Sequence, residues 1–173
     1  MEKSFGEGEG AMVMRFSPQE ILTMAVELEK KGMAFYEGLV QKATSASAKE
    51  AFSLLKDEEA KHLEFFSSLL SEIDTSAEFI DTMGEVESYL RVIVEDGVLG
   101  KVLRGVGVPS PQADLIEAIN FGIEVEKESI LFYQGFADFV PQAKMEWLQK
   151  VIDEERRHFV YLSGLKKEWG GGS

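Results

Sequence analysis

The sequence predicts an all-α protein, an antiparallel four-helix bundle made of two similar helical hairpins with one long crossover between them. Four long segments carry apolar residues at the three- and four-residue spacing of a helix, and none shows the sustained alternation of a strand. In addition, residues 25–39 align with residues 122–136 at an offset of 97. A repeat of this length predicts two copies of one helical unit.

The first hairpin is predicted over residues 17–73. Ser17 and Pro18 mark the start of its first helix, because serine is a favoured N-cap and proline suits the first helical position. Glu20 stands where a capping box needs an acidic residue. The second helix, predicted over 47–73, follows a short serine-rich turn.

The crossover is predicted over residues 74–110 and the second hairpin over residues 111–169. This mixed stretch contains a candidate short helix near 84–95, followed by the glycines and proline of GVLGKVLRGVGVP. The hairpin helices are then expected over 111–139 and from Pro141 onward. The crossover is long enough to run the length of a bundle helix, which is about 38 Å at 1.5 Å per residue.

Composition restricts the classes of function. The net charge of −13 argues against binding to nucleic acid or to an anionic membrane surface. The chain has no cysteine, so it can form neither a disulfide nor a thiolate metal site. No segment is apolar over the roughly 18 residues that a membrane span needs. We therefore expect a cytoplasmic domain at 17–169, between flexible tails at 1–16 and 170–173.

The only two histidines stand in nearly identical phrases, DEEAKH and DEERRH, which end at His62 and His158. Glu59 and Glu155 each precede a histidine by three residues, a spacing that places carboxylate and imidazole on one face of a helix. A single pair of this kind is more often a solvated pair than a ligand set. Its duplication in both hairpins favours a metal site.

Two further glutamates are predicted to face the core. Glu29 and Glu126 are the equivalent glutamates of the repeat, and each continues the apolar stripe of its helix. Each is followed seven residues later by a tyrosine, Tyr36 in one hairpin and Tyr133 in the other. All six candidate ligands lie near the middle of their helices. In a bundle of four similar helices they would therefore meet at one height.

Burial of these side chains predicts bound cations. Each ionised carboxylate in a protein interior costs on the order of several kcal/mol unless it is neutralised. Two divalent cations would balance the charge of four carboxylates. Oxygen-rich ligation with one imidazole per ion suits iron or manganese, and such sites also accept zinc or cobalt.

The sequence leaves two roles open for residues near these ligands. Tyr36 and Tyr133 are either core residues with satisfied hydroxyls or hydrogen-bond partners beside the metals. Glu58 and Glu154 directly precede the ligand glutamates. They either orient the imidazole of the opposite hairpin or are exposed, solubilising charges.

These residues resemble the ferritin-like superfamily, and most closely the diiron domain of rubrerythrins. The resemblance covers residues 17–169 and rests on the phrases EKKGMAFY and EKESILFY and on the pattern Glu29, Glu59-x-x-His62, Glu126, Glu155-x-x-His158. It implies a ferritin-like bundle with a non-haem diiron centre. In the family pattern, glutamates like Glu59 and Glu155 bridge the two irons. Glutamates like Glu29 and Glu126 are terminal, and each histidine binds one iron.

The resemblance also implies an activity, the reduction of hydrogen peroxide or dioxygen by the diferrous centre in oxidative-stress defence. Tyr36 and Tyr133 would then be candidate catalytic residues that hydrogen-bond the ligand carboxylates. The alternatives are ferritin-like oxidation and storage of ferrous iron, and a metal-free helical interaction module. A homodimer is expected.

Two departures from the rubrerythrin pattern bear on this activity. The rubredoxin module, which binds iron through four cysteines, is absent because the chain has no cysteine. Electrons would then come from a separate donor protein such as a rubredoxin. Rubrerythrin also brings an extra carboxylate to the site from its third helix, and Ser129 stands here three residues after Glu126.

Overall fold

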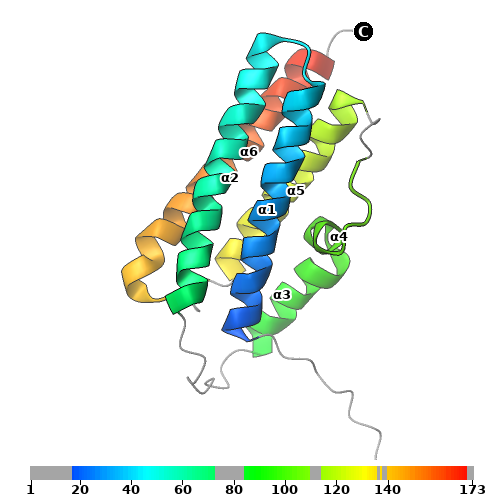
Figure 1. Cartoon of the computed structure of the whole chain (residues 1–173). Coiled ribbons are helices and arrows are strands. Elements are labelled where there is room, and N and C mark those ends of the chain that lie inside the picture. The colour runs from blue at the N-terminus through cyan, green and yellow to red at the C-terminus, as the bar shows by residue number, and fades with distance from the viewer. Residues whose placement is uncertain (1–16, 73–83, 110–113, 136, 138–139, 171–173) are drawn as a thin grey trace, which may run out of the picture.

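The structure is a computed structural model that describes residues 17–72, 84–109, 114–135, 137 and 140–170. Within these residues, four long helices form an antiparallel bundle and two shorter helices lie along one side of it (Figure 1). The same residues contain no strand, and the predicted all-α bundle is confirmed. The tails predicted at 1–16 and 170–173 lie outside the described residues, except for Gly170, which ends the last helix.

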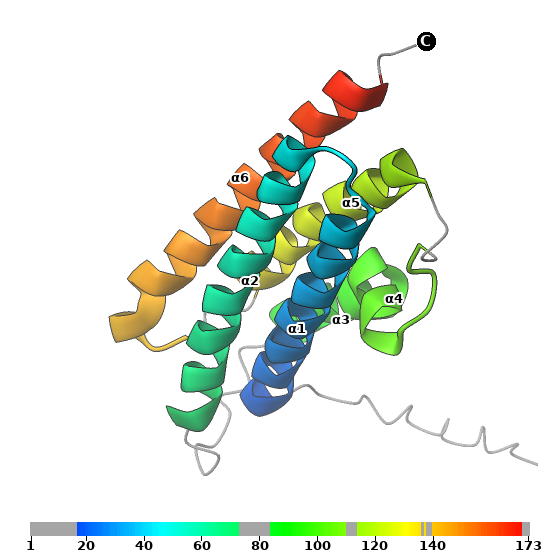
Figure 2. The same ribbon diagram turned by 45° about the horizontal axis from the view of Figure 1, so that its top comes forward.

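The bundle helices are α1 (Pro18–Lys42), α2 (Ala46–Glu72), α5 (Leu115–Gly135) and α6 (Met145–Gly170). Helices α1 and α2 pack together as one hairpin, and α5 and α6 as the other. The shorter helices are α3 (Gly84–Asp96) and α4 (Val98–Arg104). Helix α4 packs against both α1 and α5, and α3 packs against α5 (Figure 2). The crossover therefore covers the α1–α5 side of the bundle.

The first helix of each hairpin starts at a side-chain cap. The Ser17 hydroxyl accepts a hydrogen bond from the Glu20 backbone N–H at 3.2 Å, and the Glu20 carboxylate accepts one from the Ser17 N–H at 2.7 Å. This is the predicted capping box. At the start of α5, the Asp114 carboxylate accepts from the N–H groups of Ile116 and Glu117 at 2.7 and 3.0 Å. Both caps satisfy backbone donors that lack partners in the helix.

The predicted bounds of the last two bundle helices need correction. Helix α5 begins at Leu115 after the Asp114 cap, while Pro111 and Phe139, its predicted ends, lie outside the described residues. Helix α6 does not begin at Pro141. A 3₁₀ turn, η2 (Gln142–Lys144), comes first, with the Lys144 N–H donating to the Pro141 carbonyl at 2.7 Å. Proline here sets up the turn before the α-helix.

The short helix predicted near 84–95 is confirmed as α3, and the glycine-containing stretch after it contains a further helix, α4, that the sequence did not predict. Glycines stand at both ends of α4 and at its contact with α3. Gly97 is the N-cap, and Gly105 takes a left-handed φ of 68° at the C-cap. At Gly100 a Cβ would collide with the Val94 carbonyl of α3. Glycine permits this close approach, so it brings α4 onto α3.

The apolar core is divided into two clusters along the bundle. One cluster includes Leu22, Phe66, Phe132 and Val151, and the other includes residues such as Phe52. On each of the four bundle helices, the predicted ligands fall between residues of these two clusters. The core therefore leaves a polar layer at mid-height. None of the helices in the described part of the chain is both long and apolar enough to cross a membrane.

Candidate metal centre

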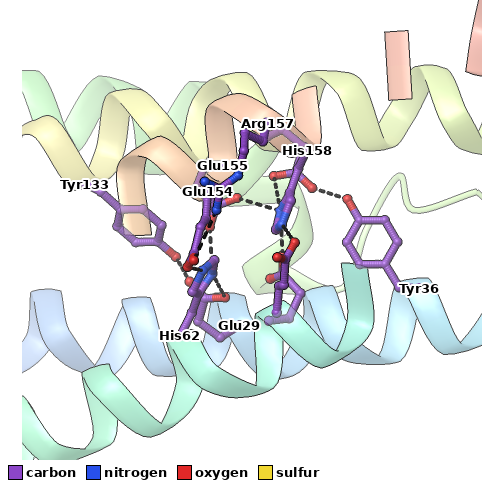
Figure 3. Close-up of polar contacts among 11 residues, drawn as sticks. Glu29, Tyr36, His62, Tyr133, Glu154, Glu155, Arg157 and His158 are labelled. Carbon is purple, nitrogen blue, oxygen red and sulfur yellow. Dashed lines mark hydrogen bonds and ion pairs between the residues drawn. The ribbon is translucent and has the colours of Figure 1, made fainter. Parts of the chain in front are cut away.

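The polar layer contains all six predicted ligands. Glu29 comes from α1, Glu59 and His62 from α2, Glu126 from α5, and Glu155 and His158 from α6. None of these side chains belongs to a residue more than 5 % exposed. The two imidazoles stack at a centroid distance of 5.8 Å, between the two hairpins (Figure 3). The convergence predicted from helix midpoints is therefore observed.

Their ligand atoms form two sets, each with three carboxylates and one imidazole. The first set is Glu29, Glu59, His62 and Glu155, and the second is Glu59, Glu126, Glu155 and His158. Within each set the ligand atoms lie within 4.8 Å of one another. Ligands on opposite sides of one ion stand about 4 Å apart at ordinary metal–oxygen and metal–nitrogen distances, so each set could hold one cation. Glu59 and Glu155 belong to both sets, as bridging ligands would.

Each imidazole is held by a glutamate of the opposite hairpin. The Nε2 atom of His62 lies 2.9 Å from an oxygen of Glu154, and the Nε2 atom of His158 lies 2.8 Å from an oxygen of Glu58. An ionised carboxylate only accepts hydrogen bonds, so Nε2 donates a proton to it, and in the neutral imidazole Nδ1 is the nitrogen with the lone pair. The role that the sequence left open for Glu58 and Glu154 is orientation of the imidazoles.

The Nδ1 atoms point into the cluster. His62 Nδ1 lies 3.0 Å from a Glu155 oxygen, and His158 Nδ1 lies 3.3 Å from a Glu59 oxygen. A hydrogen bond from the far ring nitrogen to a carboxylate is the usual support of a metal-bound histidine, since it fixes the tautomer and the orientation of the ring. The ring orientation therefore suits metal binding through Nδ1.

The two tyrosines hydrogen-bond the predicted terminal carboxylates. Tyr36 of α1 donates to Glu126 of α5, and Tyr133 of α5 donates to Glu29 of α1 (Figure 3). Burial and the neighbouring carboxylates raise the pKa of both phenols well above the usual value, so both remain protonated donors at neutral pH. The open choice for Tyr36 and Tyr133 is therefore decided in favour of contact with the ligands.

Four buried atoms of the cluster lack a hydrogen-bond partner among the described residues. They are Glu29 Oε2, Glu59 Oε1, His62 Nδ1 and His158 Nδ1. Such atoms are costly in a protein interior unless something else satisfies them. All four belong to the two ligand sets, and each can offer a lone pair to a cation, the Nδ1 atoms once their imidazoles are neutral. A cation in each set would satisfy them, so the residues present fit a pair of metal ions.

The electrostatics of the cluster call for positive charge. Burial and the nearby carboxylates raise the pKa of Glu59 well above its usual value, and burial together with Glu155 does the same for Glu126. Burial by itself lowers the pKa of His62, but the adjacent carboxylates of Glu155 and Glu29 outweigh it and raise the pKa to about 12. The cluster therefore binds protons tightly unless cations replace them.

One structural residue of the site was not found by sequence reasoning. Gly32 lies in the interior of α1, where a Cβ would stand 2.6 Å from a carboxylate oxygen of Glu59. Glycine in a helix interior costs about 0.5–1 kcal/mol relative to alanine, and here it makes room for a shared ligand. Its equivalent in the repeat is Ser129, another small residue, and Ser129 is buried. The sequence feature that could have indicated this role is the presence of a glycine inside the strong helical pattern of the first helix.

Comparisons with known proteins identify the family and the fold of the chain. The sequence matches the family model named Rubrerythrin over residues 20–166, most of the chain. The chain belongs to the rubrerythrin family. The comparison with curated proteins gives no match.

Two solved structures share the fold of this rubrerythrin-family chain. One is a protein from Thermotoga maritima named as a candidate ferritin-like diiron-carboxylate protein, with a TM-score of 0.65 and 24 % identity, over 89 % of this chain and 97 % of that one. The other is a hypothetical protein from Pyrococcus furiosus, with a TM-score of 0.63 and 23 % identity, over 89 % and 92 % of the two chains. Their similarity to this chain supports the ferritin-like bundle.

Proposed function

We propose that the chain is a non-haem diiron oxidoreductase that reduces hydrogen peroxide, with one iron ion in each of the two ligand sets. The observation that carries the proposal is the group of four buried ligand atoms without a hydrogen-bond partner among the described residues. They belong to two sets that share Glu59 and Glu155. Oxygen-rich ligation with one nitrogen per ion favours iron or manganese. Membership of the rubrerythrin family favours iron.

The charges of the site support two divalent ions. Four carboxylates with two neutral imidazoles carry four negative charges, which two divalent cations balance. The hydrogen bonds to Glu58 and Glu154 hold both imidazoles in the tautomer that leaves Nδ1 free. A bound iron pair would supply the two electrons that reduce the O–O bond of peroxide.

The chain's own residues would control protons and water at the site. Tyr36 and Tyr133 keep their phenolic protons next to Glu126 and Glu29. Each phenol can therefore stabilise the negative charge of a terminal carboxylate through its hydrogen bond, while its own ring stays in position. The apolar clusters above and below the site limit the access of water along the bundle. These features favour reaction with a small oxidant inside the protein over release of partly reduced oxygen.

The electrons would come from another protein. No cysteine is present in the chain, so it lacks the ligands for a rubredoxin-type iron site of its own. A separate donor such as a rubredoxin, acting in the cytoplasm on a homodimer of this chain, completes the proposal.

The proposal is tested by rapid mixing of the ferrous-loaded protein with hydrogen peroxide or with dioxygen, while absorbance of the ferric product is followed. We expect peroxide to react faster by at least tenfold, with one peroxide consumed per two irons. A His62→Ala, His158→Ala double variant is the control for free iron in solution. Faster reaction with dioxygen, together with assembly into a large hollow cage, would instead indicate ferrous iron oxidation for storage.

A further inference from the structure

A large cavity lies on the α1–α5 side of the candidate metal centre. Its volume is about 560 Å³, within the range of about 300–1,000 Å³ that small-molecule sites occupy. It is bounded by α1, α5, α4 and the segment that follows α4. Carboxylates of the centre, including Glu29 and Glu126, line its inner part. Its walls are mainly apolar, with Leu39, Phe121 and Val125 among them.

The internal repeat shows what kind of group fits such a space. Gly38 lines the cavity, and a Cβ on it would meet no atom within 4 Å. Its equivalent in the repeat is Gly135, where a Cβ would stand 2.5 Å from the Tyr89 ring and 2.9 Å from Leu90. Side chains of α3 therefore fill, beside α5, the space that stays open beside α1. The equivalent position is occupied by aromatic and aliphatic groups.

A positive charge, Lys31, distinguishes the cavity beside α1 from the filled space beside α5. Lys31 lines the cavity, and among the described residues it has no ion-pair partner, although the chain as a whole is acidic. Its equivalent, Glu128, is occupied in accepting a hydrogen bond from the Leu99 N–H at 2.8 Å. An unpaired lysine at the side of an apolar cavity is complementary to an acidic group. Lys31 and Gly38 are seven residues apart on one helix, which corresponds to about 10 Å.

We propose that this cavity binds an organic acid with an unbranched apolar body about 10 Å long. The apolar body lies between α1 and α5 beside Gly38, in the position that corresponds to the one α3 side chains fill beside Gly135. The acidic group pairs with Lys31. The inference goes beyond the proposed function, because it assigns a binding site for an organic molecule and needs no redox reaction. A medium-chain fatty acid has this shape and charge.

The test is titration calorimetry of the full-length chain with decanoate. We expect saturable binding of one decanoate per chain, and affinity about fourfold lower for each methylene removed, which corresponds to about 0.8 kcal/mol per buried CH₂. Gly38→Leu places a side chain in the cavity and should weaken binding at least tenfold. Gly164→Leu is the matched control, since Gly164 is an exposed helical glycine with equally open surroundings that does not line the cavity.

A lysine pair tests the acidic group. Lys31→Gln should weaken decanoate binding about threefold to tenfold and leave decanol binding unchanged. Lys30→Gln should change neither, because Lys30 pairs with Glu27 at 2.7 Å and does not line the cavity. Equal effects of the two lysine variants would overturn the assignment of the acid.

Three results would overturn the site itself. These are the absence of saturable binding, full affinity in Gly38→Leu, and dissociation of an oligomer by Gly38→Leu in a protein that binds no decanoate. The last would mean that a second copy of the chain covers the cavity. None of these measurements depends on iron turnover, so a failure to reduce peroxide leaves the test intact.

Discussion

The two hairpins of this protein are equivalent at the metal centre and different at the face that the crossover covers. At the centre the tyrosine and outer-glutamate contacts have counterparts, since Tyr36 bonds Glu126 while Tyr133 bonds Glu29, and Glu58 and Glu154 exchange roles in the same way. At the crossover face, α3 side chains pack on α5 but leave the matching surface of α1 open. Two similar ions are bound by similar residues from the two hairpins. The crossover is present only once, so it makes the outer faces of the two hairpins differ.

The largest expected effect separates shared from terminal ligands. Glu155→Gln alters a ligand that belongs to both sets, so the chain should fall from two bound ions to none after gel filtration. Glu126→Gln alters a ligand of one set only, and the chain should retain about one ion. Metal analysis of both variants is the measurement. Retention of two ions by both would contradict the sharing of Glu155.

The outer carboxylates should act equally in the two halves. Glu58→Ala and Glu154→Ala each remove the hydrogen bond that orients one imidazole, and each should weaken binding of one ion about 10–100-fold. Competition with a chelator measures this. Asp57→Ala is the matched control, because Asp57 is an exposed neighbour with only a 4.0 Å contact to Lys56. Equal losses in the control would show a general charge effect.

The two equivalent glycines should respond in opposite directions. Gly135→Ala forces a methyl group against Tyr89 and Leu90 and should lower the free energy of unfolding by about 1–2 kcal/mol. Gly38→Ala meets no neighbour and should raise it by about 0.5–1 kcal/mol, because alanine favours the helix. Chemical denaturation of the two variants is the measurement. The same sign for both would mean that the two faces are packed alike.

A similarly small effect is expected at the caps that start the equivalent helices. Ser17→Ala and Asp114→Ala each leave backbone N–H groups without their side-chain acceptor, at the start of α1 and of α5. Each should cost about 1 kcal/mol of stability. A thermal melt of each variant checks this, and a change in only one would show that the other helix start is fixed by tertiary packing.

Much of the symmetric part of the molecule was predictable from sequence. The repeat and the Glu-x-x-His phrases place Glu29 and His62 with their partners, because helical spacing fixes the face on which a side chain lies. Capping chemistry fixes the start of α1 in the same way. These features depend on local geometry, which a single segment of sequence encodes.

The asymmetric part was not predictable in this way. In the sequence, the glycines around α4 suggest only a connection. In the structure, Gly97 and Gly105 cap a helix, and Gly100 allows that helix to pack closely on α3. The choice between exposed charge and imidazole support for Glu58 depends on the distance between two hairpins. Likewise, the contact of Gly32 with Glu59 and the cavity beside Gly38 depend on how separate helices approach one another. Such contacts join segments far apart in sequence.

The central claim is that the six buried side chains bind two metal ions in equivalent sets. The most direct measurement is the iron content of the purified, ferrous-reconstituted chain compared with that of the His62→Ala, His158→Ala double variant. We predict two irons per chain for the natural sequence and loss of stoichiometric binding in the variant, with the helical circular dichroism retained. An unchanged iron content in the double variant would contradict the claim.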